Sequence, residues 1–167
     1  MLSNKTKQWM AGNGFNPEQI NDEGQHQDSA LILACRKGER VYVEDLLAAG
    51  ADVNLRNMDG TDALWAACVA DDYVIADLLL QQGANIDNQN DNGASVLMYA
   101  ASNGRSPWVN YLLQAGANIS LRSLDDFSAL DLASTITILR TLKKAEQEKS
   151  AEGIIEISSE ATVQTTV

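Results

Sequence analysis

The chain contains few of the residues on which enzymes and metal sites depend. It holds one histidine, His26, among 167 residues, so a metal cluster built on histidines has too few ligands. Its two cysteines, Cys35 and Cys68, lack the C-x-x-C spacing, and neither a GxxxxGK[ST] nor a GxGxxG phosphate-binding loop occurs. We therefore predict that the protein is not an enzyme and that it has no catalytic residue, no cofactor and no metal.

Basic residues and long apolar runs are also scarce. Twelve Lys and Arg stand against 23 Asp and Glu, which gives a net charge of -11 and opposes binding to phosphate backbones. The apolar runs are far shorter than the roughly 20 residues that span a bilayer, and the first residues lack the layout of a signal peptide. The sequence thus predicts an acidic cytoplasmic protein that binds neither nucleic acid nor membranes.

What the chain does have is an internal repeat with a step of 33 residues. The step relates leucines and alanines, Leu-Leu pairs and Gly-Ala pairs, without a gap. The matching positions are Leu31, Leu64, Leu97 and Leu130; Ala34, Ala67, Ala100 and Ala133; the pairs that begin at Leu46, Leu79 and Leu112; and the pairs that begin at Gly50, Gly83 and Gly116. A fixed step of this size predicts a stacked array.

This register resembles the ankyrin repeat over residues 20–144. The turn and first-helix signature reads Asp-Gly-Thr-Asp-Ala-Leu at 59–64, and Leu-Leu-x-x-Gly-Ala-Asp/Asn-Val/Ile ends the second helix three times. The family's Thr-Pro-Leu-His tetrapeptide is changed at 29–32, 62–65, 95–98 and 128–131, where neither Pro nor His is present. The resemblance implies an all-α solenoid of antiparallel helix pairs joined by hairpin-like turns.

Helix boundaries follow from capping residues. Ser29, Asp62, Ser95 and Ser128 each precede an apolar run, so we expect first helices to begin at the next residue. Second helices should begin near Val41, Tyr73 and Pro107, the last with Ser106 as its cap, and should end at Gly50, Gly83 and Gly116. The turns at 57–60 and 90–93 should project as fingers. The last finger has Asp126 where glycine is expected and should be looser.

Both ends of the array are modified. We predict a capping half-repeat at 1–19, with a disordered leader as the alternative, then repeats near 21–54, 55–87, 88–120 and 121–145. Residues 146–167 are polar and predict a flexible tail. Its end, Thr165-Thr166-Val167, satisfies the short motif of a PDZ ligand, and an ordinary tail is the alternative. Cys35 and Cys68 lie one repeat apart and should be free, buried thiols.

The resemblance also implies a concave binding face, made of finger tips and first helices. Its expected members are Met58, Asp59, Thr61, Trp65, Val69, Asp91, Asn92, Ala94, Met98, Ser102, Asn103, Leu124, Asp125 and Phe127. Met58, Val69, Leu124 and Phe127 form its apolar part. For Trp65 and Met98 a role as core fillers is the alternative. The first repeat adds His26, Asp28, Arg36 and Lys37.

Two functions remain open. The first is a protein–protein interaction module, monomeric on its own, whose concave face binds a folded partner as a scaffold, assembly aid or inhibitor. The second is a regulatory or assembly subunit of an enzyme whose activity resides in the partner. Acidic residues on or beside the face predict a partner with a basic patch; they are Asp28, Asp59, Asp62, Asp91, Asp125, Asp126 and Asp131. Asp45, on a second helix, should face away from the partner.

Overall fold

A computed structural model of the chain describes residues 1–163, with side chains placed for 1–151. Within this range the regular structure is helical, apart from single bridges that join Glu23 to Ser29 and Gln89 to Ser95. The predicted all-α repeat fold is therefore confirmed. The chain divides into two compact units, Met1–Val96 and Leu97–Val167, and each is described by itself.

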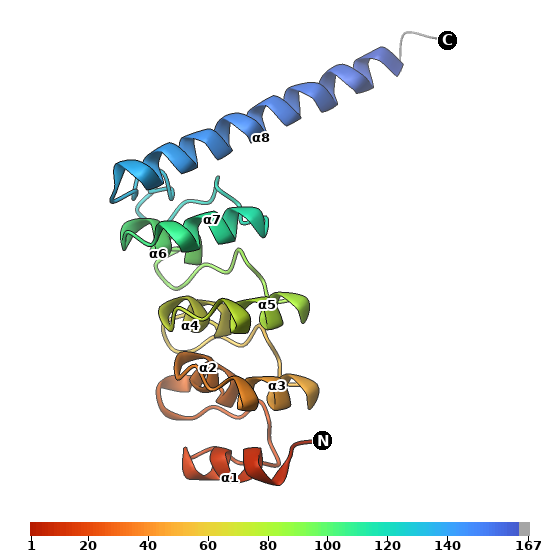
Figure 1. Ribbon diagram of the computed structural model, residues 1–167, viewed down its shortest axis with the longest axis vertical. Coiled ribbons are helices and arrows are strands. Elements are labelled where there is room, and N and C mark those ends of the chain that lie inside the picture. Colours follow the sequence, from red (N-terminus) through yellow and green to blue (C-terminus); the bar gives the residue numbers. More distant parts are fainter. Residues whose placement is uncertain (164–167) are drawn as a thin grey trace. The chain divides into compact units, whose positions relative to one another are not determined.

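The first unit stacks a single helix and two helix pairs (Figure 1). The second helix of each pair runs beside the first, α2 contacts α4, and α3 contacts both α1 and α5. A short 3-10 turn, η1, precedes the first pair. The elements are α1 (Asn4–Gly12), η1 (Gln25–Gln27), α2 (Ala30–Arg36), α3 (Arg40–Ala48), α4 (Ala63–Val69) and α5 (Tyr73–Gln81).

The second unit contains α6 (Val96–Ser102, which begins one residue before it), α7 (Ser106–Gln114) and α8 (Ile136–Val163). Helix α8 packs against α7 and buries Ile138 and Leu142. Before α8, the backbone N–H and the hydroxyl of Ser134 both donate to the carbonyl oxygen of Ala101, at 3.1 and 2.9 Å. These bonds hold the start of α8 against the end of α6.

Most of the expected helix boundaries are found. The side chain of Ser29 accepts the N–H of Ile32 at 3.2 Å, and that of Asp62 accepts the N–H of Trp65 at 2.9 Å. Helix α7 begins at Ser106, so the residue expected as its cap is its first helical residue. Gly50, Gly83 and Gly116 follow the second helices with φ of 91, 84 and 91°, the left-handed conformation expected there.

The fourth repeat does not form the first helix that Ser128 predicts. Residues 129–132 make only turns, in which the N–H of Leu132 donates to the carbonyl of Ser128 at 3.2 Å. The carboxylate of Asp131 accepts the N–H and the hydroxyl of Ser128, at 2.9 and 2.6 Å. The Ser128 hydroxyl in turn accepts the N–H of Asp131 at 3.3 Å, which completes the reciprocal pattern of a helix capping box. The turn nevertheless ends at Leu132, because so short a segment gains too few helical hydrogen bonds to offset the cost of nucleation.

The chain beyond residue 145 also differs from the predicted tail. Helix α8 continues without a break to Val163. Residues 145–152 are rich in Ala, Glu, Gln and Lys, which are strong helix formers whether or not they bury a face, and this explains the extension. The proposed PDZ motif at 165–167 lies outside the described residues.

The N-terminal segment packs on the first repeat. Met10 is fully buried and Phe15 is 5% exposed, while the ring of Trp9 stacks on Tyr42 with centroids 4.9 Å apart. Phe15 also explains why residue 24 is glycine, since a Cβ atom on Gly24 would lie 2.6 Å from the Phe15 ring. Cys35 and Cys68 are buried free thiols, as expected, and burial raises the pKa of the Cys35 thiol.

Asp62 caps α4 with a buried carboxylate, and this gives a pH-dependent prediction. Burial raises its pKa above the ordinary value of 3.8, although the N–H of Trp65 acts in the opposite direction. Serine caps the equivalent helix at Ser29 without a charge, so Asp62→Ser should keep the cap and stabilise the fold at neutral pH by up to about 1 kcal/mol.

The direction of this pH dependence follows from the raised pKa of Asp62. The protonated carboxyl is the form that the folded state favours, so wild-type stability relative to Asp62→Ser should fall as the pH rises from 3.8 through the folded pKa. Urea titrations between acid and neutral pH measure this difference. Asp62→Ala is the control and should cost about 1 kcal/mol at neutral pH, because it removes the cap. A difference between wild type and Asp62→Ser that does not change with pH would contradict the burial argument.

Candidate protein-interaction surface

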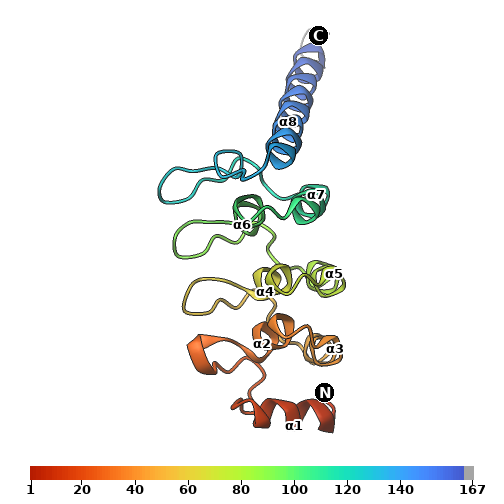
Figure 2. The same ribbon diagram turned by 60° about the vertical axis from the view of Figure 1, so that its left-hand side comes forward.

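Four loops, which we call fingers, precede the first segment of each repeat. They comprise residues 24–28, 57–61, 90–94 and 123–127, and in each the first residue donates its N–H to the carbonyl of the last, at 2.8, 2.9, 2.9 and 2.9 Å. Figure 2 shows that the first two fingers of the first unit lie on the side away from α3 and α5. The 33-residue step is therefore kept in the loops as well as in the helices.

A polar side chain at the base organises each of the last three fingers. The side-chain oxygen of Asn57 accepts the N–H groups of Asp59 and Thr61 at 3.1 and 3.0 Å. Asn90 accepts from Asn92 and Ala94 at 3.1 and 2.9 Å. At the same offset, the shorter Ser123 accepts from Phe127 at 3.2 Å. This role was not predicted from the sequence, although Asn57 and Asn90 recur at the repeat step.

The finger tips are ordered by left-handed residues. Gly60 and Gly93 have φ of 74 and 72°, and Asp126 takes their place with φ of 63°. The predicted looser last finger is not observed, because it keeps the closing hydrogen bond and the Arg122 guanidinium donates to the Asp126 carbonyl at 2.6 Å. This bond holds the tip where glycine is missing.

The predicted surface residues of the first unit lie on two adjoining fingers and on α4. The N–H of Asp91 donates to the carbonyl of Asp59 at 3.1 Å, which holds the two tips together. Met58 is 53% exposed and Val69 is also exposed. The exposed residues include Asp59, Asp91 and Asn92, whereas Thr61, Trp65 and Ala94 are half-buried.

The second unit contributes α6 and the fourth finger. Leu124, Asp125 and Phe127 are exposed on that finger. Ser102 and Asn103 are exposed at the end of α6, where both side chains donate to the carbonyl of Tyr99, at 3.1 and 2.9 Å. Met98 is 1% exposed, which corrects its assignment to the surface: it stands on the inner side of α6 and supports the alternative of a core residue.

Of the acidic residues expected at this face, most have structural partners. Asp28 is buried and binds Arg36 and the Asn57 amide, and Asp62 is buried as the cap of α4. The side chain of Asp91 pairs with Arg56 at 3.1 Å, while Asp126 and Asp131 both lie near Arg122, at 3.5 and 3.7 Å. Among the described residues, Asp59 and Asp125 have exposed carboxylates that pair with no cation. These two carboxylates have no competing cation, whereas the exposed Asp91 and Asp126 already have arginine partners.

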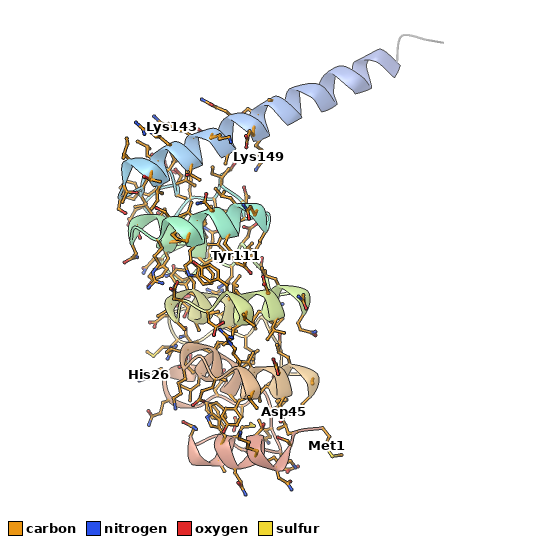
Figure 3. The ribbon with its side chains drawn as sticks, in the orientation of Figure 1. Met1, His26, Asp45, Tyr111, Lys143 and Lys149 are labelled. Atoms are coloured by element: carbon orange, nitrogen blue, oxygen red, sulfur yellow. The ribbon has the colours of Figure 1, made fainter. Side chains whose placement is uncertain are left out.

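Asp45, predicted to face away from a partner, is not an inert surface position. Labelled in Figure 3, it lies on α3, and its carboxylate accepts the N–H and the hydroxyl of Ser3 at 2.9 and 2.7 Å. Hydrogen bonds from Thr6 and Ser3 lower its pKa. A substitution at Asp45 would therefore disturb the attachment of α1. Glu44, exposed on the same helix, is the better control for binding experiments.

Charge is distributed unevenly along the chain. Residues 41–96, which hold the second and third fingers, most of α3, and α4 and α5, contain ten acidic residues and a single base, Arg56. Arg40, just before this range, pairs with one of these acids, Asp72, at 2.8 Å. Because Arg56 donates to the carbonyls of Gly60 and Gln89, its charge is held between two fingers. This part of the first unit therefore presents a strongly negative surface.

Comparison with known proteins identifies one family. A family model described as ankyrin repeats, in three copies, matches residues 3–90, 31–123 and 68–150. No curated protein sequence matches the chain. In the part of the chain that the structure describes, none of the helices has both the length and the apolar character needed to cross a membrane.

Proposed function

Because the chain belongs to the ankyrin-repeat family, whose repeats are in general protein–protein interaction modules, we propose that it binds a folded protein partner through its fingers and first helices. The proposed module acts by binding and not by catalysis. In the family this face is the concave one. The proposal assigns the contact to the exposed members of the predicted surface and leaves out Met98.

One observation carries the proposal: the second finger presents Met58, 53% exposed, directly beside the unpaired carboxylate of Asp59. The hydrogen bonds that Asn57 accepts and the contact with the third finger fix this loop before any partner arrives. A loop that is already ordered loses little conformational entropy on binding, and an exposed apolar group beside a charge is typical of an interface anchor and its rim.

Charge indicates the chemistry of the partner. The negative surface of residues 41–96 would attract a patch of Lys and Arg and repel an acidic protein. Charges at a rim mainly set the association rate, whereas desolvated apolar anchors mainly set the dissociation rate. The proposed partner is therefore a protein with a basic patch around an apolar pocket.

The proposal can be tested by affinity purification with the full chain, followed by rate measurements on the recovered partner. Asp59→Lys should slow association roughly threefold to tenfold at low salt and flatten its salt dependence. Met58→Ser should instead speed dissociation roughly tenfold. Asp91→Lys is a poorer choice, because it would place a second cation beside Arg56 and disturb the finger itself.

Glu44→Lys provides the matched control. It reverses the same charge on α3, a helix that lies on the side away from the fingers in Figure 2. Its association rate should stay within about twofold of the wild-type value. If Glu44→Lys weakens binding as much as Asp59→Lys and Met58→Ser do, the finger side is not the binding face.

A further inference from the structure

Within the first unit, the first and the second finger are each contacted by the finger that follows. The N–H of Met58, at the tip of the second finger, donates to the carbonyl of His26 in the first at 3.1 Å. One step further, Asp91 of the third finger donates to the carbonyl of Asp59 at 3.1 Å. The same backbone atoms pair at the same offset in both contacts: the second residue of the following finger donates its N–H to the carbonyl of the third residue of the preceding one.

Side chains complete the cover. The amide of Asn57 donates to Asp28 at 3.0 Å, and that of Asn88 donates to the carbonyl of Gly60 at 3.1 Å. Asp28 is consequently buried at the last position of the first finger, and Thr61 is half-buried at the same position of the second. The outer side of a finger in this unit is thus closed by polar contacts from the next repeat.

The fourth finger, in the second unit, has the same internal closure but no finger after it. The chain continues instead into the turns at 129–132 and α8, which packs on α7. In the described part of the chain, no residue donates a hydrogen bond to the carbonyl of Asp125, the counterpart of the His26 and Asp59 carbonyls. The capping helix therefore covers α7 and leaves the outer side of the last finger open.

The residues on this open side differ from their counterparts. Phe127, 49% exposed, stands at the position of Asp28 and Thr61, and Leu124, 78% exposed, at the position of Met58. Two large apolar side chains exposed to water on an ordered loop are unfavourable. Their exposure therefore indicates a binding surface. The unpaired carboxylate of Asp125 lies between them in the sequence.

We propose that the outer side of the fourth finger binds a loop of the protein partner, which stacks there as a following finger would. The loop donates one backbone N–H to the Asp125 carbonyl, covers Phe127 and Leu124 with an apolar side chain, and places Lys or Arg beside the Asp125 carboxylate. This inference rests on the proposed function and identifies one point of contact together with the chemistry of the loop that occupies it. Recognition by backbone pairing at an open edge is an established mode of peptide binding.

A second copy of the chain fits this site poorly. The first finger is the one that would have to stack on the fourth, and its Gly24 is already packed against the Phe15 ring of the N-terminal segment. Two copies with a net charge of -11 each would also repel one another, and the partner side of this contact calls for a cation. Charge thus favours a basic loop from a different protein.

Short disulfide-closed peptides displayed on phage, selected against the full chain, are the probe that tests this. Selected peptides should combine an apolar residue with Lys or Arg, and Phe127→Ser and Leu124→Ser should each weaken their binding about tenfold or more. Leu124 is so exposed that its variant leaves the fold intact, which thermal melts would verify. Asp125→Asn should weaken binding less and reduce its salt dependence.

Methylation of the peptide nitrogens, one at a time, tests the backbone bond. One methylated position should lose about tenfold or more in affinity, and no sensitive position would exclude the bond to the Asp125 carbonyl. Val41→Ser also removes an exposed apolar side chain but lies on α3, so it is the matched control and should leave peptide binding unchanged. If Met58→Ser abolishes binding while Phe127→Ser and Leu124→Ser do not, the fourth-finger site is refuted and the proposed function stands. If only Glu44→Lys abolishes binding, both the fourth-finger site and the proposed function fail.

Discussion

Replacing Asn57 by alanine should lower the free energy of unfolding by about 2 to 4 kcal/mol, a large effect for a loop residue. Asn57 is 8% exposed. Its side-chain oxygen accepts three hydrogen bonds inside the second finger, from the N–H of Asp59 and from the N–H and hydroxyl of Thr61. Its amide donates to buried Asp28 at 3.0 Å. Alanine removes all four bonds and leaves a buried carboxylate with one donor fewer.

Asn90→Ala is the matched control. Asn90 organises the third finger through two hydrogen bonds, to Asn92 and Ala94, and it stands at the same position of the repeat. Its replacement should cost about 1 to 2 kcal/mol, since fewer bonds are lost. Urea unfolding of both variants measures the difference. Equal losses would mean that the bond between Asn57 and Asp28 contributes nothing to stability.

Asn57→Asp separates the hydrogen bonds that Asn57 accepts inside the finger from the one that it donates to Asp28. The carboxylate can still accept the bonds inside the finger, but it cannot donate to Asp28 and places a second negative charge beside it. The variant should therefore be less stable than wild type at neutral pH and recover part of the loss in acid, where a carboxyl protonates. A loss that is the same at both pH values would assign the effect to shape and not to charge.

The repeat register made most of the helical fold predictable. Caps such as Ser29 and Asp62 and the glycine after each second helix are local signals, and local hydrogen bonds decide whether they act. The fourth repeat shows the limit of this reasoning: Ser128 makes the reciprocal bonds of a helix cap with Asp131, yet residues 129–132 form only turns. A cap does not make a helix by itself, because enough residues must follow it to offset the cost of nucleation.

Side-chain roles at the surface were less predictable than helices, because burial separates residues that look alike in the sequence. Asp28, Asp59 and Asp62 were all expected to contribute to one acidic face, but only Asp59 presents an unpaired carboxylate. Met98 and Met58 are both methionines of the predicted surface, and one is buried while the other is 53% exposed. Such distinctions depend on which neighbouring element covers each position, and the repeat pattern does not specify this.

Deleting residues 1–15 should destabilise the protein far more than deleting residues 151–167. The first deletion removes Met10, which is fully buried, and Phe15, which is 5% exposed. Each is worth about 1.5 to 3 kcal/mol when fully buried, so the loss should reach roughly 3 to 6 kcal/mol. A domain of this size is stable by only about 5 to 15 kcal/mol, and the truncated chain should therefore be partly unfolded at moderate temperature.

The two deletions differ in effect because the two ends of the chain bury different amounts of apolar surface. At the N-terminus, Trp9 stacks on Tyr42 and Lys37 donates to Asn13 at 2.8 Å, so the deletion also uncovers the outer side of α2 and α3. In α8 the buried residues Ile138 and Leu142 lie near the start of the helix, before the cut at residue 151. The C-terminal deletion should therefore change the free energy of unfolding by less than about 1 kcal/mol. Thermal and urea melts of the two truncated chains test this, and similar midpoints would show that α1 does not protect the first repeat.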